Sequence, residues 1–422
     1  MNKKISAVSQ EVIKENINGL DVYFIPFKRN SYSIRYVVRF GSDITEFKRD
    51  NDKDFIKIPK GVAHFLEHKM FEEEDGVDPF SFYSKYGTDA NASTGHKKTE
   101  YTLDGVTGIE KNLDFLLKYV NEPYFTDQNV ESEKDIIIQE ILMYMDEPDS
   151  RLLNELYMAL FKKHNVRYDI AGSVASVRKI KKEDLYNCYN TFYNKHNMYL
   201  IVCGNFDKEK IINVIKNNKY LDNNSKKVNV LVRKPKEGLE VFKKEKRIYL
   251  ESIYTPRFLG AIKMRFDSMD KEDMCKFSLT VLVIMTSLFG DESKFKEDIL
   301  ARGLVTTFSF FDTVVDEFLL FSFYAEGECL DDVIRLMKRK ANTSLTKDMV
   351  ERAKRSILSD TIFKYDTVMG VCDIVSSFID DFGDIVYDEI DIIKSITLDD
   401  VNKVKENIDF ENSSFVIAEA KK

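Results

Sequence analysis

One short stretch, residues 61–71 (GVAHFLEHKMF), constrains this chain more than any other. It contains His-x-x-Glu-His, the reverse of the commoner His-Glu-x-x-His order of zinc proteases. Apolar residues recur at helical spacing through it, so we expect a helix. On a helix His64 and His68 lie one turn apart on one face, and both imidazoles can reach one metal ion. Glu67 is offset around the helix, where it can contact a water on that ion as a general base.

A catalytic zinc site generally has three protein ligands and a water, so a third ligand is needed. Residues 131–145 are predicted to form a long helix. Its expected core-facing residues are Ile136, Ile137, Leu142 and Met143. Glu133 and Glu140 are two turns apart and share a face. Glutamates on helices are usually solvated, which is the ordinary reading of Glu133. Glu140 lies among isoleucines, where a carboxylate needs a cation.

With these two helices the chain resembles a known family, the inverted-motif zinc peptidases that include pitrilysin, insulin-degrading enzyme and the mitochondrial processing peptidase. In that family a glutamate on a later helix completes the histidine pair, and a second glutamate precedes it by two turns. The resemblance implies that His64, His68 and Glu140 bind one Zn²⁺ per chain. It also implies that Glu67 is the general base and that Glu133 supports the ligands.

Composition limits the number of domains, the kinds of partner and the cellular location that we expect. A chain of 422 residues is too long for one ordinary core, and 43% hydrophobic residues suffice for two or more. The formal net charge of −8 argues against nucleic acid as an obligate partner. Five scattered cysteines, with no Cys-x-x-Cys pair, favour reduced thiols and a cytoplasmic location. We expect neither a signal peptide nor a membrane span, because no apolar run is long enough.

Several polar stretches have ordinary interpretations. Residues 72–75 (EEED) are expected to be a solvated loop rather than a cation site, since clustered like charges normally face water. The charged stretch 43–57 is predicted to be a loop, and residues 80–87 a short helix that ends at a glycine. His96 is expected to be exposed and not to bind a metal.

Residues 88–94 (TDANAST) are predicted to form a polar turn that leads into a strand at 99–103 (TEYTL). The family carries an Asn-Ala-x-Thr stretch here, in a strand along the catalytic cleft to which the substrate backbone adds. The resemblance therefore implies that Asn91, Ala92 and Thr94 contact substrate. An ordinary turn and strand remains the alternative from the local pattern.

A polar, lysine-rich segment at residues 222–247 is predicted to be a linker. It would separate an N-terminal zinc-binding peptidase domain, residues 1–221, from a C-terminal domain, residues 248–422. After the linker the pattern restarts. An apolar strand at 258–266 resembles an earlier one, and an apolar helix at 274–289 takes the place of the metal helix without any histidine.

We therefore expect an α+β protein with two homologous α/β sandwich domains, each an antiparallel-rich mixed sheet flanked by helices. Only the first would retain the metal motif. The family resemblance implies that the two domains form one half of a clam-shell, which a homologous half closes over a peptide substrate.

The second domain departs from the family at one place. An arginine and a tyrosine there clamp substrate and oxyanion in many members, whereas this chain has Asp298 and Thr306, and Arg302 is out of register. An oxyanion stabiliser contributes about two to three orders of magnitude in rate. The resemblance thus implies the zinc-bearing subunit of a heterodimer whose homologous partner chain supplies the Arg and Tyr. A homodimer remains the alternative.

These observations predict a zinc-dependent endopeptidase, or its catalytic subunit, that hydrolyses peptides in an enclosed chamber with water activated by Glu67. Two alternatives remain open. The chain could be a non-catalytic scaffold or peptide-binding subunit of the same fold, or a zinc-binding peptide carrier without turnover.

Overall fold

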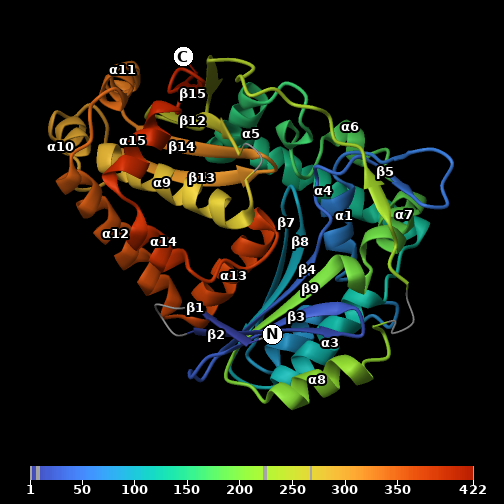
Figure 1. Ribbon diagram of the computed structural model, residues 1–422. Helices are drawn as coiled ribbons and strands as arrows, with labels where there is room; N and C mark the ends of the chain where they lie inside the picture. The colour runs from blue at the N-terminus through green and yellow to red at the C-terminus, as the bar shows by residue number, and fades with distance from the viewer. Residues whose placement is uncertain (1, 6–9, 222–225, 267–268, 422) are drawn as a thin grey trace. The chain divides into compact units, whose positions relative to one another are not determined.

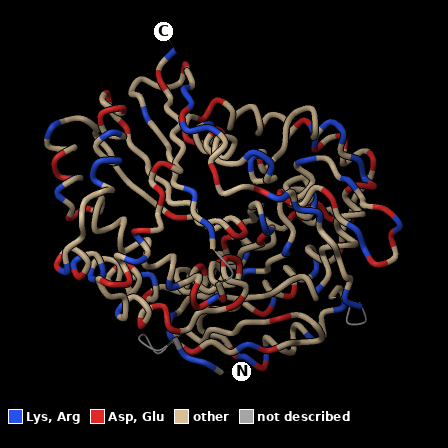
Figure 2. The backbone as a smooth tube through the Cα atoms, turned by 45° about the horizontal axis from the view of Figure 1, so that its top comes forward, with Lys and Arg blue, Asp and Glu red and all other residues tan. Residues whose placement is uncertain are grey.

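The computed structural model describes residues 2–5, 10–221, 226–266 and 269–421 (Figure 1). The chain divides into two compact units, and each combines segments from both halves of the sequence. The first unit comprises residues 1–142, 168–235 and 364–377. The second comprises residues 143–167, 236–363 and 378–422. Acidic and basic residues are interspersed along the chain in both units (Figure 2).

The first unit contains a seven-stranded sheet in the order β1-β2-β3-β9-β4-β8-β7, and only β3 and β9 pair in parallel. Its strands are β1 (Asn2–Ile5), β2 (Gln10–Ile17), β3 (Leu20–Pro26), β4 (Tyr32–Val38), β7 (Asp89–Thr94), β8 (Thr99–Gly105) and β9 (Met198–Gly204). A small second sheet joins β5 (Glu46–Arg49), β6 (Ile56–Lys57) and β10 (Val230–Val232). The helices are α1 (Val62–Lys69), α2 (Pro79–Ser84), α3 (Ile109–Asn121), α4 (Asp127–Asp146), α6 (Val174–Val177), α7 (Lys182–Phe192) and α8 (Lys208–Asn217).

Strand β4 is buried along its whole length, because both faces of the sheet are covered. Ile34, Tyr36 and Val38 join a core that includes apolar residues of α1, α3 and α4. The alternate residues face the other side. There Arg35 forms ion pairs with Glu100 (3.2 Å) and with Asp373 (3.3 Å) from the 364–377 segment. The sheet therefore supports the metal helix on one face and a segment from the far end of the chain on the other.

The second unit contains a five-stranded sheet in the order β11-β15-β12-β14-β13. Its strands are β11 (Glu245–Leu250), β12 (Arg257–Arg265), β13 (Thr307–Val315), β14 (Phe318–Glu326) and β15 (Ser413–Ala420). Its helices are α5 (Pro148–Leu160), α9 (Lys271–Phe289), α10 (Lys294–Ala301), α11 (Leu330–Ala341), α12 (Lys347–Tyr365), α13 (Val368–Phe382), α14 (Glu389–Ser395) and α15 (Leu398–Glu406). The end of α12 and the start of α13 belong to the first unit.

The two sheets repeat one topology. The order β3-β9-β4-β8-β7 in the first unit matches β11-β15-β12-β14-β13 in the second, strand for strand along the chain. In each sheet the first of these pairs is parallel and the other three are antiparallel. This match confirms the predicted fold of two homologous domains with mixed sheets.

The two copies of the topology exchange helical segments. Helix α5, from the first half of the chain, packs against β11, β12 and β15 of the second unit through Leu152, Leu156 and Leu160. In return, residues 364–377 belong to the first unit. The predicted linker, residues 222–247, falls between the two copies of the topology. The two compact units have other boundaries, because each includes segments from both sides of the linker. Residues 222–225 of that linker lie outside the described residues, β10 lies within it, and β11 begins at Glu245.

The structure corrects the predicted core face of the Glu140 helix. Ile136, Leu142 and Met143 are 57%, 43% and 58% exposed. Ile137 is buried as predicted, and the rest of the buried stripe is Val130, Ile138 and Ile141. Three consecutive isoleucines left the face ambiguous, and Val130, two turns before Ile137, identifies the correct one.

Three predicted loops also differ. Within 43–57, β5 and β6 pair as a short antiparallel hairpin around buried Phe47. The acidic stretch 72–75 is not wholly solvated, because Glu73 is buried against Lys118. His96 is half-buried, and its Nδ1 lies 2.9 Å from the Ser42 hydroxyl. Glu73 and His96 are buried beside partners distant in sequence, Lys118 and Ser42, which local patterns cannot reveal.

Within the described part of the chain, no single helix is long and apolar enough to cross a membrane. The consecutive helices α9 and α10, bent by 43° relative to each other, meet the length and composition criteria only when taken together.

Candidate metal centre

Helix α1 carries the His-x-x-Glu-His motif, and its start is fixed by Gly61. This residue has φ of 92°, and a side chain there would collide with the backbone carbonyl of Ala171. Glycine tolerates both conditions. From this start the helix buries Val62, Phe65 and Leu66 in the core of the first unit. The two histidines are thereby turned to a more accessible face, as predicted.

The structure brings His64, His68 and Glu140 together. Nε2 of His64 lies 3.7 Å from one carboxylate oxygen of Glu140, and Nε2 of His68 lies 3.4 Å from the other. One ligand atom from each of the three residues lies within 4.8 Å of the other two. Two imidazoles and one carboxylate form a donor set typical of catalytic zinc.

Unsatisfied polar atoms at this cluster fit a bound cation. Oε2 of Glu140 is buried and has no hydrogen-bond donor among the described residues. A buried carboxylate oxygen without a partner is costly, and a metal ion would compensate for it. Burial, followed by the charge of His68, lowers the pKa of His64 to about 4. The imidazole is therefore neutral, and so able to bind a metal, at ordinary pH.

Glu133 holds His68 from the side away from Glu140. Nδ1 of His68 donates to Oε1 of Glu133 over 3.0 Å, so that in the neutral imidazole Nε2 is the unprotonated nitrogen and faces Glu140. Burial opposes the charged form of Glu133, but the hydrogen bond from His68 and the nearby Lys69 charge outweigh it and lower its pKa. Burial likewise opposes the charged form of His68, and the bond to Glu133 outweighs it and raises the pKa.

Glu67 lies beside His68 and is held by a strand of the sheet. The hydroxyl of Thr94, at the end of β7, donates to Oε2 of Glu67 over 2.6 Å. Thr94 also lies 3.4 Å from the Thr99 hydroxyl, which donates to the Phe40 carbonyl. Glu67 is 9% exposed, and burial raises its pKa, although the Thr94 bond acts in the opposite direction. The carboxylate is thus fixed in position by β7.

The residues predicted to contact substrate lie on β7, a true strand rather than a turn. Asn91 is exposed, Ala92 is partly buried, and Thr94 binds Glu67. β7 is the last strand in the sheet order, so within the described residues its outer edge has no strand neighbour. The contact of Asn91, Ala92 and Thr94 with substrate stays a prediction.

Lys69 is the residue near the site that sequence reasoning missed. It is only 1% exposed, forms an ion pair with Glu72 and lies 3.7 Å from the Glu133 carboxylate. A signal was present, because Lys69 follows Phe65 and Leu66 by four and three positions and so shares their buried face.

Comparisons with known proteins agree with this geometry. A family profile described as Insulinase (Peptidase family M16) matches residues 57–174, and one described as Peptidase M16 inactive domain matches residues 179–357. A Bacillus subtilis (strain 168) protein described as the uncharacterized zinc protease YmfH is 33% identical over 95% of each chain. The chain belongs to the M16 peptidase family.

Other M16 proteins extend the comparison. The crystal structure of an M16-like peptidase from Alicyclobacillus acidocaldarius matches with a TM-score of 0.91 and 28% identity, over 98% of this chain and 99% of that one. The mitochondrial-processing peptidase subunit beta of Dictyostelium discoideum is 23% identical over 74% of this chain and 70% of its own. The predicted family is therefore confirmed.

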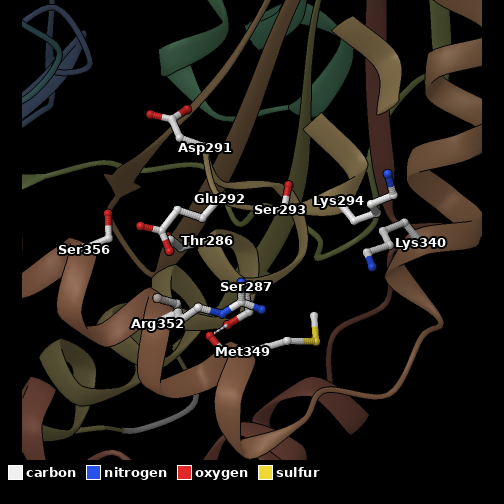
Figure 3. A pocket seen from close by; sticks show the side chains of 11 residues that line it. Thr286, Ser287, Asp291, Glu292, Ser293, Lys294, Lys340, Met349, Arg352 and Ser356 are labelled. Atoms are coloured by element: carbon white, nitrogen blue, oxygen red, sulfur yellow. Dashed lines mark hydrogen bonds between the residues drawn. The ribbon is translucent and has the colours of Figure 1, made fainter. Parts of the chain in front are cut away.

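The second copy of the M16 topology has a different site at the corresponding place. Residues 346–360 align with residues 126–140, with threonine, valine, glutamate, lysine and isoleucine at the same positions. Here Ala353 replaces Glu133, and exposed Asp360 replaces Glu140. A cavity of about 150 Å³ lies between α9 and α12, and Ala353 is among the residues that line it. Figure 3 shows this cavity from close by.

Hydroxyls and mixed charges line this cavity of the second copy. Figure 3 shows Arg352 extending toward Ser287, with Lys294 and Lys340 at the side away from Ser356. Lys294 pairs with Asp298 (2.7 Å), and Arg352 pairs with Asp348 (3.1 Å). The carboxylates of Asp291 and Glu292 line the same cavity. This M16 chain thus has converging imidazole and carboxylate groups in one copy and paired surface ions in the other.

The residues at the expected Arg and Tyr positions form no oxyanion clamp. Asp298 pairs with Lys294, and the Thr306 hydroxyl donates to the Glu326 carbonyl over 3.1 Å. Arg302 ends α10 and is exposed.

Proposed function

We propose that this M16 chain is a zinc-dependent endopeptidase, or the catalytic subunit of one, that hydrolyses peptides. The observation that carries the proposal is the convergence of His64, His68 and Glu140 within 4.8 Å, with Glu67 fixed beside them. Scaffold proteins need no such donor set. The names of the relatives, zinc protease and processing peptidase, support the same chemistry.

His64, His68 and Glu140 would hold the ion, and Glu133 would keep the Nδ1 proton of His68 in place. When bound, zinc supplies Lewis acidity to a water molecule and to the peptide carbonyl. The Glu67 carboxylate would accept a proton from the attacking water and pass it to the leaving amine. Its raised pKa, due first to burial, suits both transfers near neutral pH.

The free edge of β7 offers a place for the substrate. An extended peptide can add to an exposed sheet edge through backbone hydrogen bonds. Because Thr94 binds Glu67, a peptide on β7 would lie next to the general base. Asn91 and Ala92 are on the same strand and are proposed to contact the peptide. If the substrate enters an enclosed chamber, an unstructured peptide should be cut faster than the same sequence within a folded protein.

The test is hydrolysis of a quenched mixed-peptide library by the zinc-loaded chain, compared with Glu67→Gln. We expect the rate to fall by about two to four orders of magnitude while one zinc stays bound, because Glu67 is not a ligand. Equal rates in the two proteins would refute the proposed role of Glu67. A wild-type chain that binds no zinc would refute the peptidase proposal altogether.

A partner chain is the second part of the proposal. Asp298 and Thr306 provide neither of the groups that clamp the oxyanion in relatives, so a homologous partner that supplies an arginine and a tyrosine would complete a heterodimer. Zinc binding without turnover, followed by turnover after addition of such a chain, would support this arrangement. The profile match named for an inactive domain, at residues 179–357, supports a non-catalytic second copy. Absence of turnover with every partner would favour the scaffold or carrier alternatives.

A further inference from the structure

We propose that Lys69 is a positioning residue for the zinc site: its buried ammonium holds Glu133, and through Glu133 the ligand His68, in the geometry that binds the ion. The inference rests on the proposed function in taking zinc as the ion. It assigns a role to a residue outside the ligand set and outside the general base.

The ammonium of Lys69 is a buried charge. Lys69 is 1% exposed, and lysine is almost never buried to this degree without ionic partners. Its two partners are the carboxylates of Glu72 and Glu133. Glu133 is itself largely buried, with a side chain 15% exposed, and uses its other oxygen to accept from His68. The ammonium therefore neutralises the carboxylate that orients a ligand.

The partners of Lys69 also connect helix α1 to helix α4. Nδ2 of Asn129, in the first turn of α4, donates to Oε1 of Glu72 over 3.1 Å. Asn129 is held in turn by reciprocal hydrogen bonds with Thr126 at the start of α4. Glu133 lies one turn further along α4. Lys69, at the end of α1, is thus bound by two carboxylates that α4 holds at successive turns.

This connection sets the register of the metal ligands. The histidines are on α1 and Glu140 is on α4, so the distances between ligand atoms depend on how these helices are aligned. The Lys69 cluster joins the two helices beside His68 and leaves Glu140 free to face both imidazoles. A small slip of α4 along α1 would separate the donor atoms.

Stability alone does not account for a lysine at this position. Replacing a whole buried ion pair by apolar residues is often neutral or stabilising, whereas removing one partner leaves a buried charge uncompensated. Phe65 and Leu66 make this face of α1 apolar, so packing alone does not require the lysine and its carboxylates. A methionine would fill the space. It could not neutralise Glu133, which would then be free to turn from His68 toward the ion.

The experiment measures zinc affinity of the folded, metal-depleted chain by chelator competition. We expect Lys69→Met to weaken binding by about ten- to a hundredfold, the usual effect of losing an outer partner of a metal ligand. Lys118→Met is the matched control, because Lys118 also pairs with a buried glutamate, Glu73, but contacts no residue of the site. The control should retain wild-type affinity.

A double-mutant cycle tests the route through Glu133. In a Glu133→Gln background, Lys69→Met should cause little further loss, whereas an undiminished loss would overturn the proposal. If Lys69→Met does not fold, Lys69→Gln keeps a donor but not the charge and should still bind zinc at least about tenfold more weakly.

Wild-type affinity in a folded Lys69 variant would overturn the inference and leave the peptidase proposal intact. Tight zinc binding by wild type without peptide hydrolysis, both alone and with a homologous partner chain, would instead count against the peptidase proposal alone.

Discussion

The two copies of the repeated topology differ most in the helix that follows the central strand. In the first copy α1 has eight residues and turns two histidines away from the core. In the second, α9 has nineteen residues, and Ser287 near its end donates to the Val283 carbonyl within the same helix. The second copy keeps the strand order but lacks the two histidines. A few side chains on two helices, rather than the topology, therefore determine which copy can bind a metal.

Lysines are buried in both copies, and two of them, Lys69 in the first and Lys263 in the second, have different roles. Lys69 contacts carboxylates of the metal site. Lys263, on β12, donates to the carbonyls of Leu160 (3.2 Å) and Gly238 (2.8 Å) and lies over the rings of Phe161 and Phe318. The first lysine organises a site, whereas the second joins segments of the second unit.

The strongest test of this difference removes the matching carboxylate from each copy. Glu140→Gln should weaken zinc binding by more than about a hundredfold, because the loss of a ligand exceeds that of an outer partner. Asp360→Asn, at the aligned position on α12, should leave zinc binding unchanged. Isothermal titration of metal-depleted protein measures both. An equal loss in the two variants would contradict the assignment of the metal to the first copy.

A smaller effect is expected from the strand that holds Glu67, the proposed general base. Thr94→Val removes a hydrogen bond to a charged group, a contribution of about 1.5–3 kcal/mol, and should lower kcat by about ten- to a hundredfold. Thr94→Ser should restore most of the rate. Thr102→Val, on the neighbouring strand, removes a hydroxyl bond to the Asn91 carbonyl and serves as the control. Steady-state kinetics would contradict the role of Thr94 if the valine variant changed only KM.

The smallest expected effect is on how stability against unfolding varies with pH, through Lys263 of the second unit. Burial lowers the pKa of Lys263 from 10.5 to about 8. Between these values the unfolded chain holds a proton that the folded lysine has released, so stability should rise with pH. The gain is at most about 1.4 kcal/mol per pH unit. Urea unfolding between pH 8 and 10 should show this rise in the parent relative to Lys263→Met. A difference that does not vary with pH would contradict it.

The convergence of His64, His68 and Glu140 was predictable because these residues are few and their spacing is helical. His64, Glu67 and His68 lie within two turns of one helix, and the partner glutamates lie two turns apart on another. What could not be predicted depends on contacts between distant segments. The bond from Thr94 to Glu67 and the pairing of Lys118 with Glu73 join parts of the chain that no local pattern relates.

For the fold, too, local patterns were sufficient for some features, whereas others depend on contacts between distant segments. The strand pattern that restarts after residue 247 was enough to predict two similar domains, and the sheet orders agree. The core face of α4 was predicted incorrectly, because periodicity within Ile136, Ile137 and Ile138 fits either side of the helix. The exchange of α5 and residues 364–377 left no trace in composition or spacing.

That exchange limits how such a gene can be divided in evolution. A break at the linker would place residues 143–167 on one polypeptide and most of the unit that contains them on the other. Residues 364–377 would be separated from their unit in the same way. Neither product could complete its own core, so the two would have to be made together and fold as one. A gene that keeps both copies on one polypeptide keeps each compact unit whole.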